Sequence, residues 1–260
     1  MDLVYQPVVR IIIGAHRAMG WRVAISGAEH IPRAGSAVIA SNHVGYLDFT
    51  FLGYGPRERG RLIRFLAKSE VFRHPIAGPL MRGMRHIPVD RSGRAQEAMA
   101  ASLDALRRGE VIGLFPEGTI SRSFVPAAAR SGAARLAMQA GAPLVPAAVW
   151  GSQRLLTKGR PRNLQRGVAI SVRYGEPVAY APGEDAAEVT ARLMDRIGEL
   201  VDAAARDYPQ RPAGDADRWW LPAHLGGTAP TPEQVAQDAV RERAERREQR
   251  RRDGRAGHAE

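Results

Sequence analysis

Short apolar runs alternate with longer segments whose apolar residues recur every three or four positions through the middle of the chain. The short runs are typical of buried strands, and the longer spacing is typical of helices that pack on one face. Strands are expected at residues 36–40, 62–67, 86–89, 111–115, 144–150 and 168–174. Strands that alternate with helices predict an α/β fold with a central, largely parallel mixed sheet flanked by helices.

Helices are expected at residues 95–106, 127–140 and 186–206. The first two stop near Gly109 and Gly141, because glycine adopts the left-handed conformation of a helix C-cap at little cost. Pro143 follows the second helix and indicates a turn into the next strand. The third helix carries apolar residues along one face and is expected to close the domain.

The first residues form an apolar segment that charged side chains interrupt. Residues 4–19 read VYQPVVRIIIGAHRAM, which favours an amphipathic helix in the membrane interface and makes residues 1–23 a membrane-associating segment. A helix packed against the core is the alternative. No run reaches the roughly 18 consecutive apolar residues of a spanning helix, and the signal-peptide order is missing. We therefore expect a peripheral or monotopic protein at the cytoplasmic face of a membrane.

Composition changes after Tyr208, so the folded domain is expected at residues 24–207 and a basic, partly disordered tail at residues 208–260. Residues 241–255 hold eight arginines and four acidic residues, and a solvated stretch that is partly helical or disordered is the simplest interpretation. The alternative is that these arginines, with Trp219 and Trp220, bind an anionic membrane surface.

The net charge of +11 at pH 7 indicates an acidic partner, which nucleic acid, anionic lipid or a phosphorylated substrate would satisfy. The chain has no cysteine, which excludes disulfides, thiolate catalysis and Cys-ligated metal sites. A nucleic-acid-binding protein stays a distant alternative, because no helix-turn-helix, zinc-finger or RNA-binding aromatic signature is present. No specific nucleic acid is therefore expected as a partner.

The segment SNHVGYLD at residues 41–48 supplies an imidazole and a carboxylate five positions apart. In a regular helix His43 and Asp48 would point about 140° apart. A turn at Gly45 and a helix that begins near Asp48 would let the carboxylate reach one ring nitrogen, and the other could then accept a proton. This is the base and orienter half of a catalytic triad, with a substrate hydroxyl in place of the protein serine.

Three further segments follow at the edges of expected strands: GMRHIPVDR at 83–91, FPEGT at 115–119 and LVP at 144–146. With NHVGYLD they resemble the four-block signature of the glycerolipid acyltransferases of the lysophosphatidic acid acyltransferase type, over about residues 24–180. The resemblance implies transfer of a fatty acyl group from acyl-CoA or acyl carrier protein to the 2-hydroxyl of 1-acyl-sn-glycerol-3-phosphate. The product would be phosphatidic acid, with no metal and no cofactor beyond the acyl donor. Another lysophospholipid, glycerol-3-phosphate or a glycolipid is the alternative acceptor.

The resemblance also implies roles for individual residues. His43 would be the general base and Asp48 its orienting partner, and the binders of the acceptor would be Lys68, Arg91, Glu117, Gly118 and Thr119. An arginine fork matches phosphate oxygens, whereas Glu117 would hold an arginine or accept from a glycerol hydroxyl. Arg122 and Arg130 are further candidate phosphate contacts.

Three positions depart from the family pattern. Gly45 stands where relatives often have serine, Ile120 where they often have arginine, and Arg130 where they commonly have lysine. These changes leave the base and its partner intact but alter the expected phosphate-binding wall. His74 and His86 match no catalytic position, so ordinary surface or packing roles are expected for both. A scaffold without catalysis is disfavoured because both His43 and Asp48 are present.

Overall fold

The computed structural model describes residues 3–90 and 95–256, and within them seven strands form one sheet. The sheet order is β1-β7-β6-β2-β5-β3-β4, and neighbouring strands are parallel except for β6 and β7. The strands are β1 Arg22–Ser26, β2 Ala37–Ser41, β3 Ile63–Lys68, β4 Ile87–Val89, β5 Val111–Leu114, β6 Leu144–Trp150 and β7 Ala169–Tyr174. The expected mixed, largely parallel α/β sheet is confirmed.

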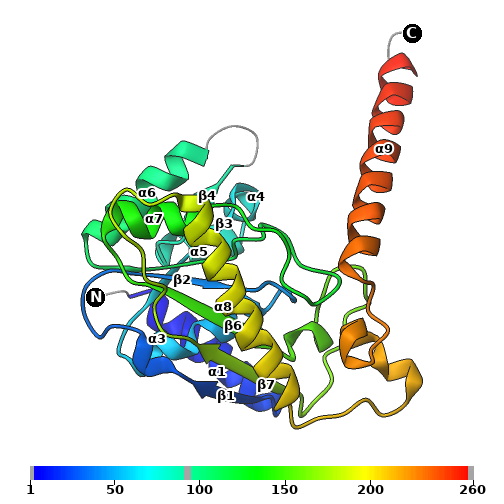
Figure 1. Ribbon diagram of the computed structural model, residues 1–260, viewed down its shortest axis with the longest axis horizontal. Coiled ribbons are helices and arrows are strands. Elements are labelled where there is room, and N and C mark those ends of the chain that lie inside the picture. The colour runs from blue at the N-terminus through cyan, green and yellow to red at the C-terminus, as the bar shows by residue number, and fades with distance from the viewer. Residues whose placement is uncertain (1–2, 91–94, 257–260) are drawn as a thin grey trace. The chain divides into compact units, whose positions relative to one another are not determined.

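Helices cover both faces of this sheet. They are α1 Tyr5–Ala18, α2 Asp48–Leu52, α3 Tyr54–Glu58, α4 Ser69–Arg73, α5 Ala77–Gly83, α6 Ala95–Arg107, α7 Gly132–Ala140 and α8 Ala186–Arg206, with α9 Pro232–Ala256 beyond the sheet in sequence. Helices α6, α7 and α8 lie on one face, and α1, α2 and α3 lie on the other (Figure 1). Short 3₁₀ helices are η1 Ala28–His30, η2 Ser152–Arg154, η3 Asp215–Trp220 and η4 Ala223–Leu225. Across the described helices, length and apolar content fall short of what crossing a membrane requires.

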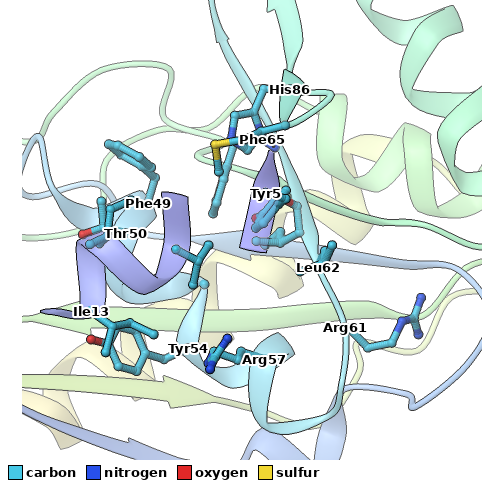
Figure 2. Close-up of a pocket in the computed structure, with 15 residues that line it drawn as sticks. Tyr5, Ile13, Phe49, Thr50, Tyr54, Arg57, Arg61, Leu62, Phe65 and His86 are labelled. Atoms are coloured by element: carbon cyan, nitrogen blue, oxygen red, sulfur yellow. Dashed lines mark hydrogen bonds between the residues drawn. The ribbon is translucent and has the colours of Figure 1, made fainter. Parts of the chain in front are cut away.

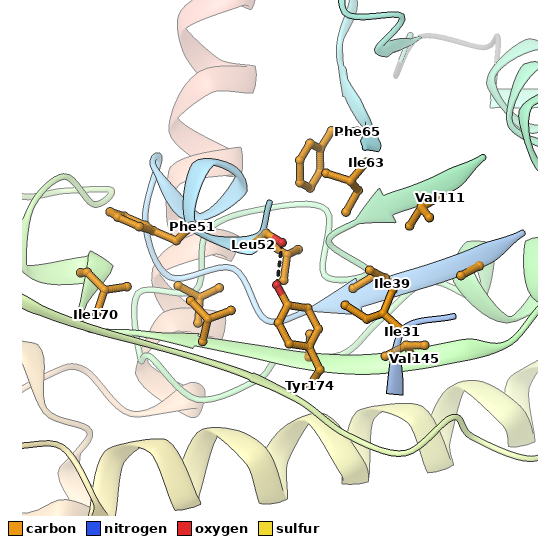
Figure 3. Close-up of a cluster of buried hydrophobic side chains, with 14 of the residues drawn as sticks. Ile31, Ile39, Phe51, Leu52, Ile63, Phe65, Val111, Val145, Ile170 and Tyr174 are labelled. Carbon is orange, nitrogen blue, oxygen red and sulfur yellow. Dashed lines mark hydrogen bonds between the residues drawn. The ribbon is translucent and has the colours of Figure 1, made fainter. Parts of the chain in front are cut away.

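The core lies between the sheet and α2 (Figure 3). Every residue of β2, β5 and β6 is buried, which explains why these strands read as continuous apolar runs rather than as alternating ones. Phe51 and Leu52 of α2 pack into this core, and the Tyr174 hydroxyl donates to the Leu52 carbonyl at 2.6 Å. The first residue of α2, Asp48, is thereby held at a defined height above the sheet.

Several elements differ from the sequence-based expectations, and the short helices α3, α4 and α5 were not expected at all. Strand β1 was not expected, because its exposed and half-buried residues alternate and give no continuous apolar run. Helix α7 begins at Gly132 rather than at residue 127. The Ala127 N–H instead donates to the Glu117 side chain, and the Arg130 N–H donates to the Pro116 carbonyl. Residues 127–130 therefore form a loop. The expected helix at 186–206 is confirmed by α8.

The chain divides into two compact units, of which the second comprises residues 122–125 and 212–260. Within this second unit α9 is helical over Pro232–Ala256, one of the two forms that the sequence left open for this stretch. Trp220 is only 1% exposed, and the ring of Trp219 packs edge-on against Phe124 at 6.4 Å between centroids. The buried Trp220 therefore contradicts the idea that both tryptophans bind a membrane surface.

Candidate active site

His43 and Asp48 meet at the turn between β2 and α2. The Nδ1 atom of His43 lies 2.9 Å from Oδ2 of Asp48. Because a carboxylate only accepts, Nδ1 carries the proton and Nε2 is left as the acceptor nitrogen. Asp48 is fully buried, whereas the His43 side chain is 20% exposed. Among the described residues no hydrogen bond to Nε2 forms, so the expected pairing with one free nitrogen is confirmed in its geometry.

The turn closes around the carboxylate. The backbone N–H groups of Val44 and Gly45 both donate to Asp48 Oδ2, at 2.7 and 2.9 Å. Ser152, which is itself fully buried, donates its hydroxyl to the other oxygen, Oδ1. These donors replace the water that a buried carboxylate loses. The sequence offered no signal for Ser152, because it lies 104 positions from Asp48.

The topology of the sheet explains why these distant residues meet. Strands β6, β2 and β5 are parallel neighbours, so the segments that follow their carboxyl ends lie along one edge of the sheet. His43 follows β2, Glu117 follows β5 and Ser152 follows β6. In open α/β sheets this edge is the usual location of a ligand site.

The ring of Phe115, the first residue of FPEGT, stacks on His43 with centroids 4.1 Å apart and an interplanar angle of 14°. Phe65 of β3 stacks in turn on Phe115 at 6.3 Å. The imidazole is therefore held at one edge by Asp48 and on one face by an aromatic ring. Its orientation is set by the first and third blocks together.

Glu117 is buried against the backbone of the His43 loop. Its Oε1 accepts from the His43 N–H at 2.9 Å, and its Oε2 accepts from the Ala127 N–H at 3.1 Å. The His43 carbonyl accepts from the Ser121 N–H at 2.8 Å. Burial raises the pKa of Glu117 to about 7, although the two backbone donors lower it, and the charge of Asp48 adds to the rise. The sequence did not predict this backbone role, since it placed Glu117 among the binders of the acceptor.

The other sequence-predicted residues of the third block lie nearby in the chain but face outward. Gly118 has a positive φ of 66°, with open space where a Cβ would lie, and Thr119 is exposed. Ile120, which stands at a position often occupied by arginine in relatives, is buried. The loop therefore presents a backbone turn to solvent.

The candidate cations differ in exposure and in pairing. Lys68, at the end of β3, is half exposed and lies 3.9 Å from a Glu70 carboxylate oxygen. Arg130 is exposed, whereas Arg122 forms ion pairs with Asp238 and Glu242 within the second compact unit. Arg91 lies outside the described residues. The structure brings His43, Asp48 and Glu117 together. Among the described residues, the side chains of Lys68, Arg122 and Arg130 form no hydrogen bond or ion pair with these three.

His86 and His74, both in the part of the chain that the structure describes, form no hydrogen bond with His43 or Asp48. His86 is buried, and its Nδ1 accepts from the Phe65 N–H at 3.0 Å. Burial lowers the pKa of His86 to about 4, and the Arg64 charge adds to this effect. His74 is exposed and accepts from backbone N–H groups of its own turn. His74 therefore lies at the surface, and His86 packs in the interior.

An apolar cavity lies beside this site, between α1, α2, α3 and β3 (Figure 2). The space between its walls, together with the adjoining open solvent, is about 530 Å³. Tyr5, Val9, Ile12 and Ile13 of α1 line one wall, and Phe49, Phe65 and His86 line another. Phe49 directly follows Asp48 in α2, and Phe65 touches the ring stack over His43. One wall of the cavity is thus continuous with the side chains that orient the imidazole.

Comparison with known proteins places this chain in a family. The family model described as Acyltransferase matches residues 22–150. Over 189 residues the chain is 31% identical to the 1-acyl-sn-glycerol-3-phosphate acyltransferase of Bacillus subtilis, covering 68% of this chain and 87% of that protein. The chain belongs to the acyltransferases of this type. His43, Asp48 and Glu117 lie inside the matched residues, and Ser152 lies just beyond them.

Two further likenesses agree with this acyltransferase assignment. A chloroplast 1-acyl-sn-glycerol-3-phosphate acyltransferase of Arabidopsis thaliana is 29% identical over 186 residues, which are 70% of this chain and 50% of that protein. The crystal structure of a 1-acyl-sn-glycerophosphate acyltransferase from Thermotoga maritima superposes with a TM-score of 0.64, at 20% identity, covering 79% of this chain and 81% of that chain. The second likeness shows that the fold is shared.

Proposed function

We propose that this acyltransferase moves a fatty acyl group from an acyl thioester to the 2-hydroxyl of 1-acyl-sn-glycerol-3-phosphate, which forms phosphatidic acid for phospholipid synthesis. The observation that carries the proposal is the His43 imidazole, oriented by a buried carboxylate and left with one acceptor nitrogen at the surface. The names of the relatives support the acceptor. The donor is acyl-CoA or acyl carrier protein.

The chemistry follows from this geometry. Nε2 of His43 takes the proton of the acceptor hydroxyl as its oxygen attacks the thioester carbonyl carbon. The carbon–sulfur bond then breaks, the sulfur leaves as a thiolate, and the proton on His43 returns to that sulfur. Asp48 stabilises the imidazolium that exists between these steps, because its Oδ2 lies 2.9 Å from Nδ1.

The apolar cavity beside α1 is proposed to hold an acyl chain. Its wall of aliphatic and aromatic side chains suits a hydrocarbon tail, and Phe49 and Phe65 connect it to the ring stack over His43. For the phosphate of the acceptor we propose the exposed cations Lys68 and Arg130, together with Arg91, as candidates. Arg122 is a weaker candidate because two carboxylates already pair with it.

An anionic membrane surface on the cytoplasmic side is the proposed location. Three exposed apolar side chains support it: Leu3 is 80% exposed, Ile11 of α1 is 72% exposed, and Ile76 between α4 and α5 is 72% exposed. Arg10, Arg17 and Arg73 are exposed on the same elements. Apolar side chains among arginines suit a boundary with anionic lipid.

A panel of acceptors tests the proposal. Wild type and His43→Ala are assayed with one acyl-CoA and one acyl carrier protein thioester against 1-acyl-sn-glycerol-3-phosphate, glycerol-3-phosphate, another lysophospholipid and a glycolipid. Activity is expected on the first acceptor and is expected to vanish in the variant. Equal activity of the two proteins would refute the role of His43. A preference for another acceptor would keep the chemistry and replace the substrate. The buried Ile120 and the paired Arg122 are the reason for including the other acceptors in the panel.

A further inference from the structure

We propose that Ser152 is a positioning residue of the active site that acts through Asp48, a role that rests on the function proposed for His43 and Asp48. Its hydroxyl donates to Asp48 Oδ1, and both side chains are fully buried. Ser152 lies outside the residues that the family model matches, 22–150. It therefore adds a third group to the pair that the first block supplies.

The distribution of donors over the carboxylate shows what Ser152 contributes. Oδ2 accepts from His43 Nδ1 and from the backbone N–H groups of Val44 and Gly45. Among the described residues, Ser152 is the group that donates to Oδ1. Three bonds on one oxygen leave the carboxylate able to pivot about that oxygen, whereas a bond on the second oxygen fixes its plane. Ser152 thus determines how Oδ2 faces the imidazole.

The backbone of Ser152 is held in place by a tight turn after β6. Gly151 has a positive φ of 97°, and a Cβ there would lie 2.2 Å from the Ala169 carbonyl oxygen, so only glycine fits. The Gly151 N–H donates to the side-chain oxygen of Gln153 at 2.8 Å. The Gly151 carbonyl accepts from the Arg154 N–H at 3.2 Å. The turn presents Ser152 to the site as a fixed group.

The segment after Ser152 is also hydrogen-bonded to the His43 loop. The Thr157 hydroxyl donates to the Val44 carbonyl at 2.6 Å, and the Tyr46 N–H donates to the Leu156 carbonyl at 2.8 Å. Gly45 permits the close approach, because a Cβ there would lie 3.1 Å from the Ser152 carbonyl oxygen and 3.2 Å from Asp48 Oδ1. Residues 152–157 and the loop are therefore built to fit each other.

This arrangement predicts a specific kinetic effect. Ser152 and Asp48 are both fully buried, so neither can bind the substrates directly. Loss of the hydroxyl should lower kcat and leave KM unchanged, because orientation matters most when His43 carries the proton. The loss of a hydrogen bond to a charged group corresponds to a decrease in kcat of about 10-fold to 100-fold.

The first experiment compares Ser152→Ala and Ser152→Cys with Ser102→Ala. Ser102 is also fully buried, but its hydroxyl donates to the Ala98 carbonyl of its own helix at 2.7 Å. Both Ser152 variants should lose about 10-fold or more in kcat with KM within about twofold, whereas Ser102→Ala should keep wild-type kcat. Cysteine keeps the size of the side chain but is a weak donor. Recovery in Ser152→Cys would show that Ser152 only fills space and would overturn the proposal.

The second experiment asks whether Ser152 acts through the carboxylate. In an Asp48→Ala background, adding Ser152→Ala should lower kcat no further, since residues that act as a unit are not additive. A full additional loss would overturn the proposal. If His43→Ala and Asp48→Ala keep activity, the proposed function itself fails. If these two variants lose activity but Ser152→Ala has the same kcat as Ser102→Ala, only the role of Ser152 fails. Thermal unfolding of each variant identifies any that does not fold. If Ser152→Ala does not fold, the kcat of Ser152→Cys relative to wild type tests the proposal.

Discussion

The buried carboxyl of Glu117 should make the stability of this acyltransferase fall as pH rises through neutrality. Burial raises the pKa of Glu117 in the folded protein from 4.5 to about 7. The folded protein therefore holds a proton on this group that the unfolded chain releases between these values. The stabilisation is fully present below about pH 4.5 and is lost as pH rises through about 7. Each pKa unit corresponds to about 1.4 kcal/mol, so the loss amounts to about 3 kcal/mol.

Glu117→Gln removes the titration and keeps the shape of the side chain. We expect the free energy of unfolding of wild type, measured by urea denaturation between pH 4.5 and 8, to fall relative to that of the variant by about 3 kcal/mol. The glutamine NH₂ must face either the His43 or the Ala127 N–H, which costs a hydrogen bond at every pH and leaves the slope unaffected. Glu70→Gln, at a side chain that is 63% exposed, controls for the change in net charge. Parallel curves for wild type and Glu117→Gln would refute the reasoning.

Three other changes give direct tests. Gly45→Ala places a Cβ 3.1 Å from the Ser152 carbonyl oxygen, so kcat should fall about 10-fold with little change in KM; unchanged kinetics would show that the loop can yield. Ile13→Trp fills the apolar cavity beside α1 and should shift preference toward shorter acyl chains in an assay over a series of acyl-CoA lengths, with an unaltered chain-length profile as the contrary result. Ile76→Glu places a charge on the proposed membrane surface and should lower binding to phosphatidylglycerol vesicles in a sedimentation assay. Val240→Glu, at a residue of α9 with similar exposure, should not lower this binding. Equal losses in the two variants would argue against that surface.

Local patterns in the sequence determined most of the architecture. Continuous apolar runs predicted β2, β5 and β6 because these strands are buried on both faces, and the helix at 186–206 followed from its periodic apolar face. The turn that joins His43 to Asp48 was also predictable, since a five-residue offset allows contact only if the helix begins at the aspartate. The edge strand β1, with half-buried alternation, carried too weak a pattern.

Tertiary structure alone decided how the distant segments complete the site. Glu117 hydrogen-bonds the backbone of His43, and Ser152 hydrogen-bonds Asp48, yet neither contact follows from spacing along the chain. Both depend on the placement of β2 between β5 and β6 with parallel registers, which brings the ends of three strands to one edge. Spacing along the chain determines which side chains a turn can join. Only the order and register of the strands determine which turns meet, because that choice depends on packing across the whole sheet.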